Sequence, residues 1–357
     1  MKFLGIKQNL RFATSSAFRK GAVIALKILI MGACFWYVVR QVSVADFVRR
    51  AHTVGLGWAS LAVLCITAQI PFSTLRWCSI IDTLSNGGKH VARRRVFAIT
   101  AIAIFIGQVL SYAVGDAARL AMLKRTGRDW RQLAVTVVLD RGIGVIVLAA
   151  FGFVTLLFPS PLAALGGNRV VALQIFGFLV FVFAVGLMTA PQIASLLKQW
   201  RMSLWLGKII LTTHNVLLRS RVGFSIVLFA AAIHALTICS IWCIGSALSM
   251  SFSLLDSAVL FTLIVVAALI PVSIGGWGVR EAAVVAMLTS QGFAAERALF
   301  FSVCYGLTLV FGYLLGALLG LVIYSPLHPD LGVNTKIGEN DDLRRELIPM
   351  GRTKFGR

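Results

Sequence analysis

Long uncharged apolar runs constrain this chain more than any other feature of its sequence. Residues 170–189 contain no charged residue, and comparable runs recur along the chain. A helix of about 20 apolar residues crosses the roughly 30 Å of hydrocarbon in a bilayer. Because lipid offers no partners to backbone N–H and C=O groups, each run has to be helical. The runs therefore predict an all-α, polytopic helical membrane protein.

The charge of the chain narrows the classes of partner. The sequence has 357 residues, of which 59% are hydrophobic, and a formal net charge of +21. In a soluble chain such a charge suggests nucleic acid, but here Lys and Arg cluster between apolar runs, the pattern that sets membrane orientation. We therefore expect a membrane and anionic lipid headgroups as partners, and no nucleic acid. The cysteines form no CxxC pair and the histidines show no metal-ligand spacing, so no metal or other cofactor is predicted.

Basic clusters and apolar runs divide the chain into three parts. Residues 1–21 are predicted as a basic cytoplasmic N-terminus, and residues 22–324 as a single membrane domain with halves 22–158 and 170–324. Residues 325–357 are predicted as a disordered cytoplasmic tail, too short to form a catalytic domain. We expect a multi-pass protein of a bacterial-type plasma (inner) membrane with both termini in the cytoplasm.

About six runs are predicted as full spans. They are residues 22–39, 56–75, 132–158, 170–189, 224–248 and 298–324. Arg76 and Trp77 follow the second span and are predicted to anchor it at the interface. Residues 190–223 combine basic residues with tryptophans and predict a helix that lies in the cytoplasmic interface.

Two further apolar runs, residues 96–114 and 254–270, lead into breaks. Basic clusters flank the first run on both sides, so a re-entrant helical hairpin that enters from the cytoplasm and breaks near residues 112–116 is predicted. The second run leads into residues 271–281, where a proline and three glycines disfavour a continuous helix. A kinked helix or an exposed loop is the alternative there.

An internal echo relates the two breaks. Residues 116–127 align with residues 281–292 at an offset of 165. Each half then contains two spans, a hairpin and a third span. Since three crossings are an odd number, the second half is predicted to be inverted, with its hairpin entering from outside. Inverted repeats with two broken elements near the midplane are common in transporters.

Charges inside the predicted spans mark the candidate site, because an intramembrane charge indicates function by default. Asp140 and Arg141 are adjacent on a helix and point about 100° apart, so each is expected to have its partner on another helix. A buried ion pair that fixes helix packing is the alternative. Arg119 and Arg280 are predicted in the first turns of helices, whose partial positive charge suits a phosphate or another anion.

The acids beside these arginines are predicted to orient them or to take protons. The predicted substrate-binding residues are Asp116, Arg119, Asp140, Arg141, Gly275, Gly276, Gly278, Arg280 and Glu281.

At these residues the sequence resembles the lysylphosphatidylglycerol synthase transmembrane-region family, also called flippase-like domain proteins. The resemblance covers roughly residues 56–324. It rests on Pro-x-Ser-x-Gly-Gly-x-Gly-x-Arg-Glu at residues 271–281, Gly-Asp-x-x-Arg at residues 115–119, and Asp140-Arg141. A proline that usually precedes the first Gly-acid-x-x-Arg turn is missing from residues 110–114. The resemblance implies movement of a lipid or lipid-linked headgroup between leaflets. It does not imply lysyl transfer, which in bifunctional relatives belongs to a soluble domain that we do not expect here.

We therefore expect transport of an anionic lipid or a polyprenyl-phosphate lipid between leaflets, without catalysis. Two other classes stay open. A membrane-embedded transferase would use Asp116, Asp140 or Glu281 as its base. An accessory subunit would hold a separate lipid-modifying synthase at the membrane. The sequence leaves open the identity of the lipid, the direction and energy source of transport, and the oligomeric state.

Overall fold

The computed structural model describes residues 54–84, 91–124, 129–159, 162, 168–197, 204–251, 253–269 and 277–324. Within these ranges there is no strand, and the prediction of an all-α protein is confirmed. The elements are α3 (Leu56–Leu84), α4 (Arg93–Val109), α5 (Tyr112–Lys124), α6 (Trp130–Leu157), α7 (Arg169–Met188), α8 (Ala190–Leu197), α9 (Leu204–His214), the π-helix η2 (Asn215–Arg219), α10 (Gly223–Ala247), α11 (Leu254–Leu269), α12 (Val279–Ser290) and α13 (Ala295–Tyr324). The predicted first span, residues 22–39, and the two terminal segments lie outside the described residues.

Five described helices are long and apolar enough to cross a membrane: α3, α6, α7, α10 and α13. They coincide with five of the predicted spans. Among them α7 has no buried residue, and Phe178 and Phe181 are 65% and 64% exposed on it. Large aromatic side chains on all sides of a helix are unfavourable in water and ordinary against lipid tails.

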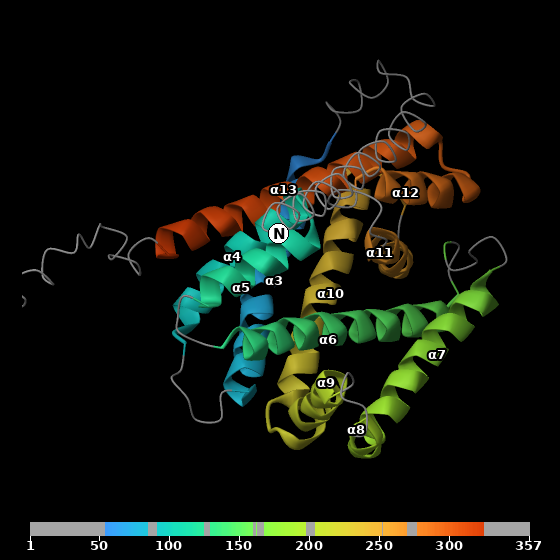
Figure 1. Cartoon of the computed structure of the whole chain (residues 1–357). Coiled ribbons are helices and arrows are strands. Elements are labelled where there is room, and N and C mark those ends of the chain that lie inside the picture. The colour runs from blue at the N-terminus through green and yellow to red at the C-terminus, as the bar shows by residue number, and fades with distance from the viewer. Residues whose placement is uncertain are drawn as a thin grey trace, which may run out of the picture.

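The long helices pack across one another (Figure 1). α3 lies beside α10 in the opposite direction, and the Gly55 N–H donates to the carbonyl of Ala247 at 2.9 Å where the two helices meet. α13 crosses α3 and packs along α4, and α6 crosses α3 and packs against α7. The crossings bring α3, α5 and α6 close enough for their charged side chains to pair.

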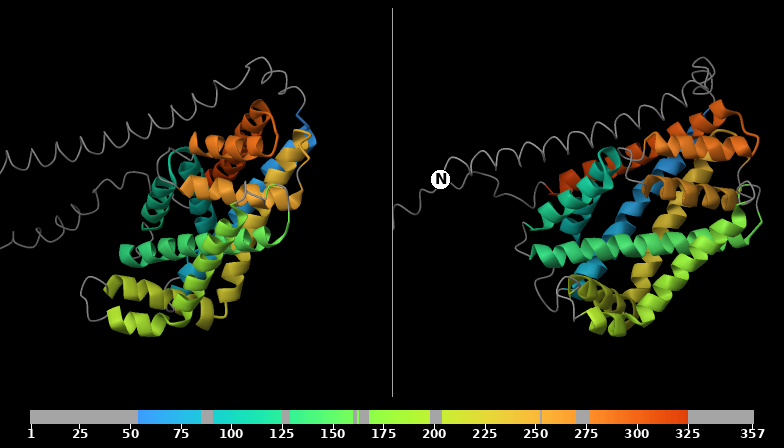
Figure 2. Two further views of the ribbon diagram at one scale, coloured as in Figure 1. Left: turned by 90° about the vertical axis from the view of Figure 1, so that its right-hand side faces the viewer. Right: turned by 45° about the vertical axis from the view of Figure 1, so that its right-hand side comes forward.

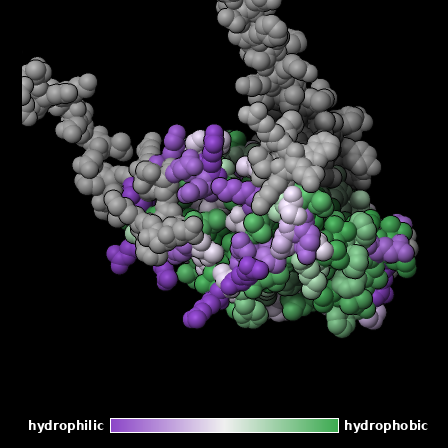
Figure 3. Space-filling view, turned by 60° about the horizontal axis from the view of Figure 1, so that its bottom comes forward, coloured by the Kyte–Doolittle hydropathy of each residue, from purple (hydrophilic) through white to green (hydrophobic). Residues whose placement is uncertain are grey.

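The two ends of the molecule differ in their charged residues. At the first, which we call the basic end, α3 ends at Leu84, α4 begins at Arg93, α5 ends at Lys124 and α6 begins at Trp130. Basic residues of the described helices gather there: Arg93, Arg94, Arg95, Lys124, Arg131, Lys208 and Arg219. Figure 3 shows hydrophilic residues on one side of the molecule and a continuous hydrophobic surface on the other.

Arginines at the opposite end bind backbone instead of facing solvent. Arg169, the first residue of α7, donates to the carbonyls of Leu156 and Leu157 at the end of α6. Arg297 of α13 donates to the carbonyl of Ser249 just beyond the end of α10. Each guanidinium thus satisfies carbonyls left unpaired at a helix C-terminus, where a positive charge is also favoured by the helix dipole.

Two helical hairpins enter the molecule from opposite ends (Figures 1 and 2). α4 and α5 form one near the basic end, and α11 and α12 form the other near the opposite end. α4 and α5 approach closely because Gly107 and Gly115 face each other: a Cβ on Gly115 would lie 2.8 Å from the Cα of Gly107. Neither hairpin contains a helix among the five that are long enough to cross a membrane.

Two sequence predictions about these elements are wrong in detail. α3 continues through Pro71 to Leu84 and buries both Arg76 and Trp77, which were predicted at the interface. Arg76 can be buried because it forms an ion pair with the Asp140 carboxylate of α6. The first break lies at Leu110 and Ser111 and not at residues 112–116, since the Ser111 hydroxyl accepts from the Val114 N–H and caps α5.

The interface helix predicted over residues 190–223 is divided into shorter elements. α8 and α9 pack against each other, and η2 leads from α9 into α10. Trp205 and Leu206 are half exposed on α9, whereas Trp200 lies outside the described residues.

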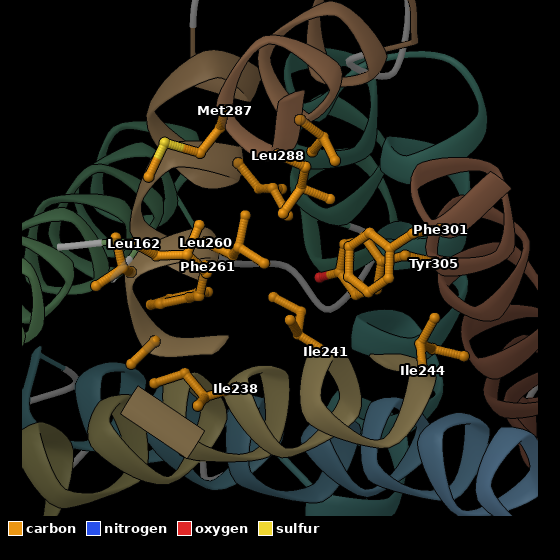
Figure 4. Close-up of a cluster of buried hydrophobic side chains, with 14 of the residues drawn as sticks. Leu162, Ile238, Ile241, Ile244, Leu260, Phe261, Met287, Leu288, Phe301 and Tyr305 are labelled. Atoms are coloured by element: carbon orange, nitrogen blue, oxygen red, sulfur yellow. The ribbon is translucent and has the colours of Figure 1, made fainter. Parts of the chain in front are cut away.

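A buried apolar cluster fixes α12 in place (Figure 4). It includes Ile241 of α10, Phe261 of α11, Leu288 of α12 and Phe301 of α13. Since lipid tails are as apolar as these side chains, the packing is favoured by van der Waals contact. The cluster packs α12 against α13 and so positions the charged residues at the start of α12.

Candidate functional site

One group of buried charges is a triad contributed by three helices. Asp140 of α6 accepts from Arg76 Nε of α3 through Oδ1 and from Arg119 Nη2 of α5 through Oδ2, both at 2.8 Å. Asp140 is 1% exposed and Arg119 2% exposed. Two arginines facing one carboxylate leave the triad with a net charge of +1. We call Arg76, Arg119 and Asp140 the triad. Its two ion pairs hold α3, α5 and α6 together.

An indole ring completes the surroundings of Arg119. The Arg119 Cζ atom lies 3.9 Å from the centroid of the Trp77 ring, within range of a cation–π interaction. Trp77 is itself fixed, because its Nε1–H donates to the Thr136 hydroxyl at 3.1 Å. Arg119 Nε has no hydrogen-bond partner within the described part of the chain. A buried donor of Arg119, one of the two arginines that share the surplus charge, is therefore unused within this part of the chain.

A second ion pair also joins α5 and α6, but it faces the surface of the molecule. Arg141 of α6 binds Asp116 of α5 in a bidentate manner, with Nε donating to Oδ2 at 2.9 Å and Nη2 to Oδ1 at 2.8 Å. The Arg141 side chain is 46% exposed and that of Asp116 19%. The Tyr112 ring lies beside this pair, 5.6 Å from the Arg141 Cζ atom. This pair, unlike the triad, is open to a ligand.

The third ion pair lies at the start of α12. Arg280 donates to Glu281 Oε1 through Nε at 2.9 Å and also through Nη2, and both residues are buried. Glu281 Oε2 accepts from the Gly278 N–H and so caps the helix. Gly278 has φ +87°, a conformation that favours glycine. The carboxylate of Glu281 thereby occupies the position at the helix N-terminus where a phosphate would bind.

α13 connects the second hairpin to the first. Gly306 leaves the space that Arg280 fills, because a Cβ there would overlap the guanidinium. Trp277 covers Arg280 at 4.5 Å from ring centroid to Cζ. Tyr305, the residue before Gly306, lies within electrostatic range of both Arg280 and Tyr112. The polar groups of the two hairpins thus approach each other across α13.

The predicted site residues fall into these three groups. The expectation that Asp140 and Arg141 have partners on other helices is confirmed. Arg280 is the second residue of α12, as expected, but Arg119 lies in the second turn of α5, so its predicted contact with the helix start is wrong. Gly275 and Gly276 lie outside the described residues. Binding of substrate by any of the nine stays a prediction.

Comparison with known proteins identifies the family of the chain. The family model described as the lysylphosphatidylglycerol synthase TM region matches residues 24–316. The chain belongs to this family. The match includes every candidate site residue and starts within the predicted first span, residues 22–39. A search of curated proteins finds no match. Membership in the lysylphosphatidylglycerol synthase TM region family makes the chain a multi-pass membrane protein related to lipid handling.

Sequence reasoning missed several residues that build the site of this family member. Arg76 was assigned to the interface, yet it completes the buried triad. The signal was present: Gln69, Ser73 and Arg76 follow each other at helical spacing on α3 and form a buried polar stripe. Gln69 connects this stripe to two other helices, because its amide donates to the Thr237 hydroxyl of α10 and accepts from the Tyr313 hydroxyl of α13. The rings of Trp77 and Tyr112 have no comparable signal, because only the fold brings them to the arginines.

Proposed function

We propose that this protein moves a phosphate-bearing lipid, or a molecule carried on a lipid, between the two membrane leaflets. The observation that supports this proposal best is the half-exposed pair of Arg141 and Asp116. Arg141 follows the start of α6 by eleven residues, which corresponds to about 17 Å along the helix axis and roughly half of the hydrocarbon thickness. An exposed charge at that depth is expected to face water or an ionic ligand.

The surroundings of Arg141 suit both parts of a phospholipid. Its planar guanidinium holds Asp116 with two parallel hydrogen bonds, the same geometry that recognises two oxygens of a phosphate. Val138 and Val145 lie on the same face of α6, one turn to either side, and are 41% and 45% exposed. A phosphate headgroup exchanges with Asp116 on Arg141, while the acyl chains stay on the apolar face. The buried arginines of the triad add positive potential without touching the headgroup.

Access from both leaflets is provided by the two hairpins. The surplus of arginine and lysine at the basic end supports an orientation in which that end faces the cytoplasm. The α4–α5 hairpin is then re-entrant from the cytoplasm and the α11–α12 hairpin from outside. Single cysteines at Lys124→Cys and Gln291→Cys in a cysteine-free background will react with an impermeant thiol reagent from opposite sides. Reaction of both from the same side would overturn the inverted arrangement.

Transport is tested by reconstituting the purified full chain in liposomes that contain a fluorescent phospholipid. The wild type is expected to speed exchange of a phosphate-bearing lipid between leaflets, and Arg141→Gln to abolish the increase. Arg141→Lys keeps the charge but loses the fork, so its exchange rate should also fall. Arg131→Gln is the matched control, because Arg131 is an exposed arginine at the start of the same helix. Equal rates for Arg141→Gln and wild type would remove this pair from the transport route.

The same preparation separates the two other classes of function. A membrane-embedded transferase would form a modified lipid when the purified protein receives a lipid-linked donor, and this product is detectable by mass spectrometry. An accessory subunit would give neither exchange nor product. Its cellular function would tolerate Arg141→Gln and would depend on the exposed surface of α8 and α9.

A further inference from the structure

A cavity of about 310 Å³ opens at the basic end, separate from the three charge groups. It lies where the end of α3, the start of α6, α9 and η2 meet. Gln132 and Arg141 are both on α6 but nine residues apart, which corresponds to about 14 Å along the axis. Cavities of roughly 300 Å³ or more are within the range of small-ligand sites. This volume therefore has its own chemistry, independent of the proposed transport site.

Three nitrogen donors from three elements line the cavity. They are the Lys208 ammonium on α9 and the side-chain amides of Gln132 on α6 and Asn215 on η2. None of the three side chains has a hydrogen-bond or ion-pair partner within the described residues. The other polar side chains, Thr83 and Thr212, donate to carbonyls of their own helices. Since no carboxylate lines the cavity, its charge is positive and uncompensated.

The remaining wall is apolar. Leu84, Val135 and Val216 contribute it, and the last two are nearly fully buried. An inorganic anion would leave this apolar surface without a partner. A ligand with an anionic group attached to a hydrocarbon chain would use both the donors and the apolar wall.

Irregular backbone shapes the cavity. η2 is a π-helix, a rare form that is frequently found at functional sites. The chain leaves η2 through a tight turn into α10 at Gly223, where a Cβ would collide with the carbonyl of Leu217. Asn215 and Val216 are thereby held near the start of α6 and the end of α3. The packing of Val216 against Val135 and Ile80 makes this placement rigid.

We propose that this cavity binds the phosphate of an anionic glycerophospholipid from the leaflet at the basic end. Lys208 forms an ion pair with a phosphate oxygen, and the Gln132 and Asn215 amides donate to the remaining oxygens. The first methylene groups of the acyl chains contact Leu84, Val135 and Val216. The bound lipid bridges α9 and η2 to α3 and α6. It is a resident lipid and not the transported one, because the cavity is remote from Arg141.

The test uses the full chain in detergent and measures binding of a short-chain phosphatidylglycerol by native mass spectrometry. Lys208→Gln is expected to weaken binding by about tenfold, the loss of one charge-assisted hydrogen bond. Asn215→Leu, which fills the cavity with an apolar group, should lower it as well. Arg219→Gln is the control, because Arg219 is an exposed cation on η2 that does not line the cavity.

Two further ligands separate the sources of the phosphate. sn-Glycerol 3-phosphate has the headgroup chemistry without chains, and diacylglycerol has the chains without phosphate. Both should bind more weakly than phosphatidylglycerol. Equal binding of glycerol 3-phosphate would show a site for a soluble phosphate, and equal effects of Lys208→Gln and Arg219→Gln would show only general attraction to basic residues. Either result overturns the proposal. Lys208→Gln is expected to leave lipid exchange in liposomes near the wild-type rate. A failure of the cavity proposal can therefore be told apart from a failure of the transport proposal.

Discussion

Asp140 and Arg141 are neighbours in sequence on the same helix, yet their surroundings are opposite. Asp140 is buried between two arginines, whereas the Arg141 side chain is 46% exposed and has one carboxylate partner. The rotation of about 100° per residue turns one side chain toward α3 and the other toward the surface beside α5. The difference teaches that a charge in a membrane helix is not a functional residue by its depth alone: exposure decides which of the two a ligand can reach.

The same contrast separates the two roles of an intramembrane charge. A buried ion removed from water needs full compensation, and Asp140 is the only carboxylate in contact with Arg76 and Arg119 among the described residues. An exposed pair keeps its solvent and contributes little to folding. We therefore interpret the triad as a clamp that holds the hairpin and the Arg141 pair as the ligand-facing group.

The largest expected effect is that of Asp140→Ala. This substitution leaves two buried arginines without a counter-charge, and the free energy of unfolding should fall by about 3 to 5 kcal/mol. The measurement is the midpoint of thermal unfolding of the purified protein, together with its amount in the membrane. A stable Asp140→Ala protein that has lost only transport would show that Asp140 belongs to the ligand site and would remove the contrast with Arg141.

An intermediate effect is expected for Arg119→Met. The variant retains Arg76 as the partner of Asp140, and the apolar methionine side chain still packs beneath Trp77. The loss should be close to that of one hydrogen bond to a charged group, about 1.5 to 3 kcal/mol. Thermal unfolding of Arg119→Met beside Arg76→Met checks this value. Losses as large as that of Asp140→Ala would show that both arginines are required and that the surplus charge has a partner of its own.

The smallest effect on stability is expected for Arg141→Gln. The pair with Asp116 is partly exposed, so its contribution to the free energy of unfolding is about 0 to 1 kcal/mol. The unfolding midpoint should stay near that of the wild type, while lipid exchange is lost. A strong drop in stability would place Arg141 with the structural charges and would leave the transport proposal without its ligand-facing group.

The two hairpins extend the comparison to the whole molecule. In both, an arginine on the second helix is paired with an acid and lies close to a tryptophan ring. The acid differs in origin: Arg119 uses Asp140 from another helix, whereas Arg280 uses the adjacent Glu281. The first arrangement depends on the contact of α5 with α6, and the second is complete within α12.

The sequence by itself determined the class and most of the map of this protein. Apolar runs of about 20 residues leave the backbone no solution other than helix, and glycines and basic clusters mark where the hairpins and ends lie. Five predicted spans followed from these local properties, and the family followed from the short motifs at residues 115–119, 140–141 and 271–281. The capping of α5 by Ser111 is also local, although the prediction placed the break a few residues too late.

Only the tertiary structure decided which charges meet. Arg76 is 64 residues from Asp140 in sequence, and no periodicity within α3 or α6 specifies how the two helices cross. The crossing follows from packing of many side chains together, and it turns Arg76 and Asp140 inward while Arg141 stays exposed. Since helical spacing fixes the face of a residue but not what lies opposite that face, the partner of each charge is a property of the fold.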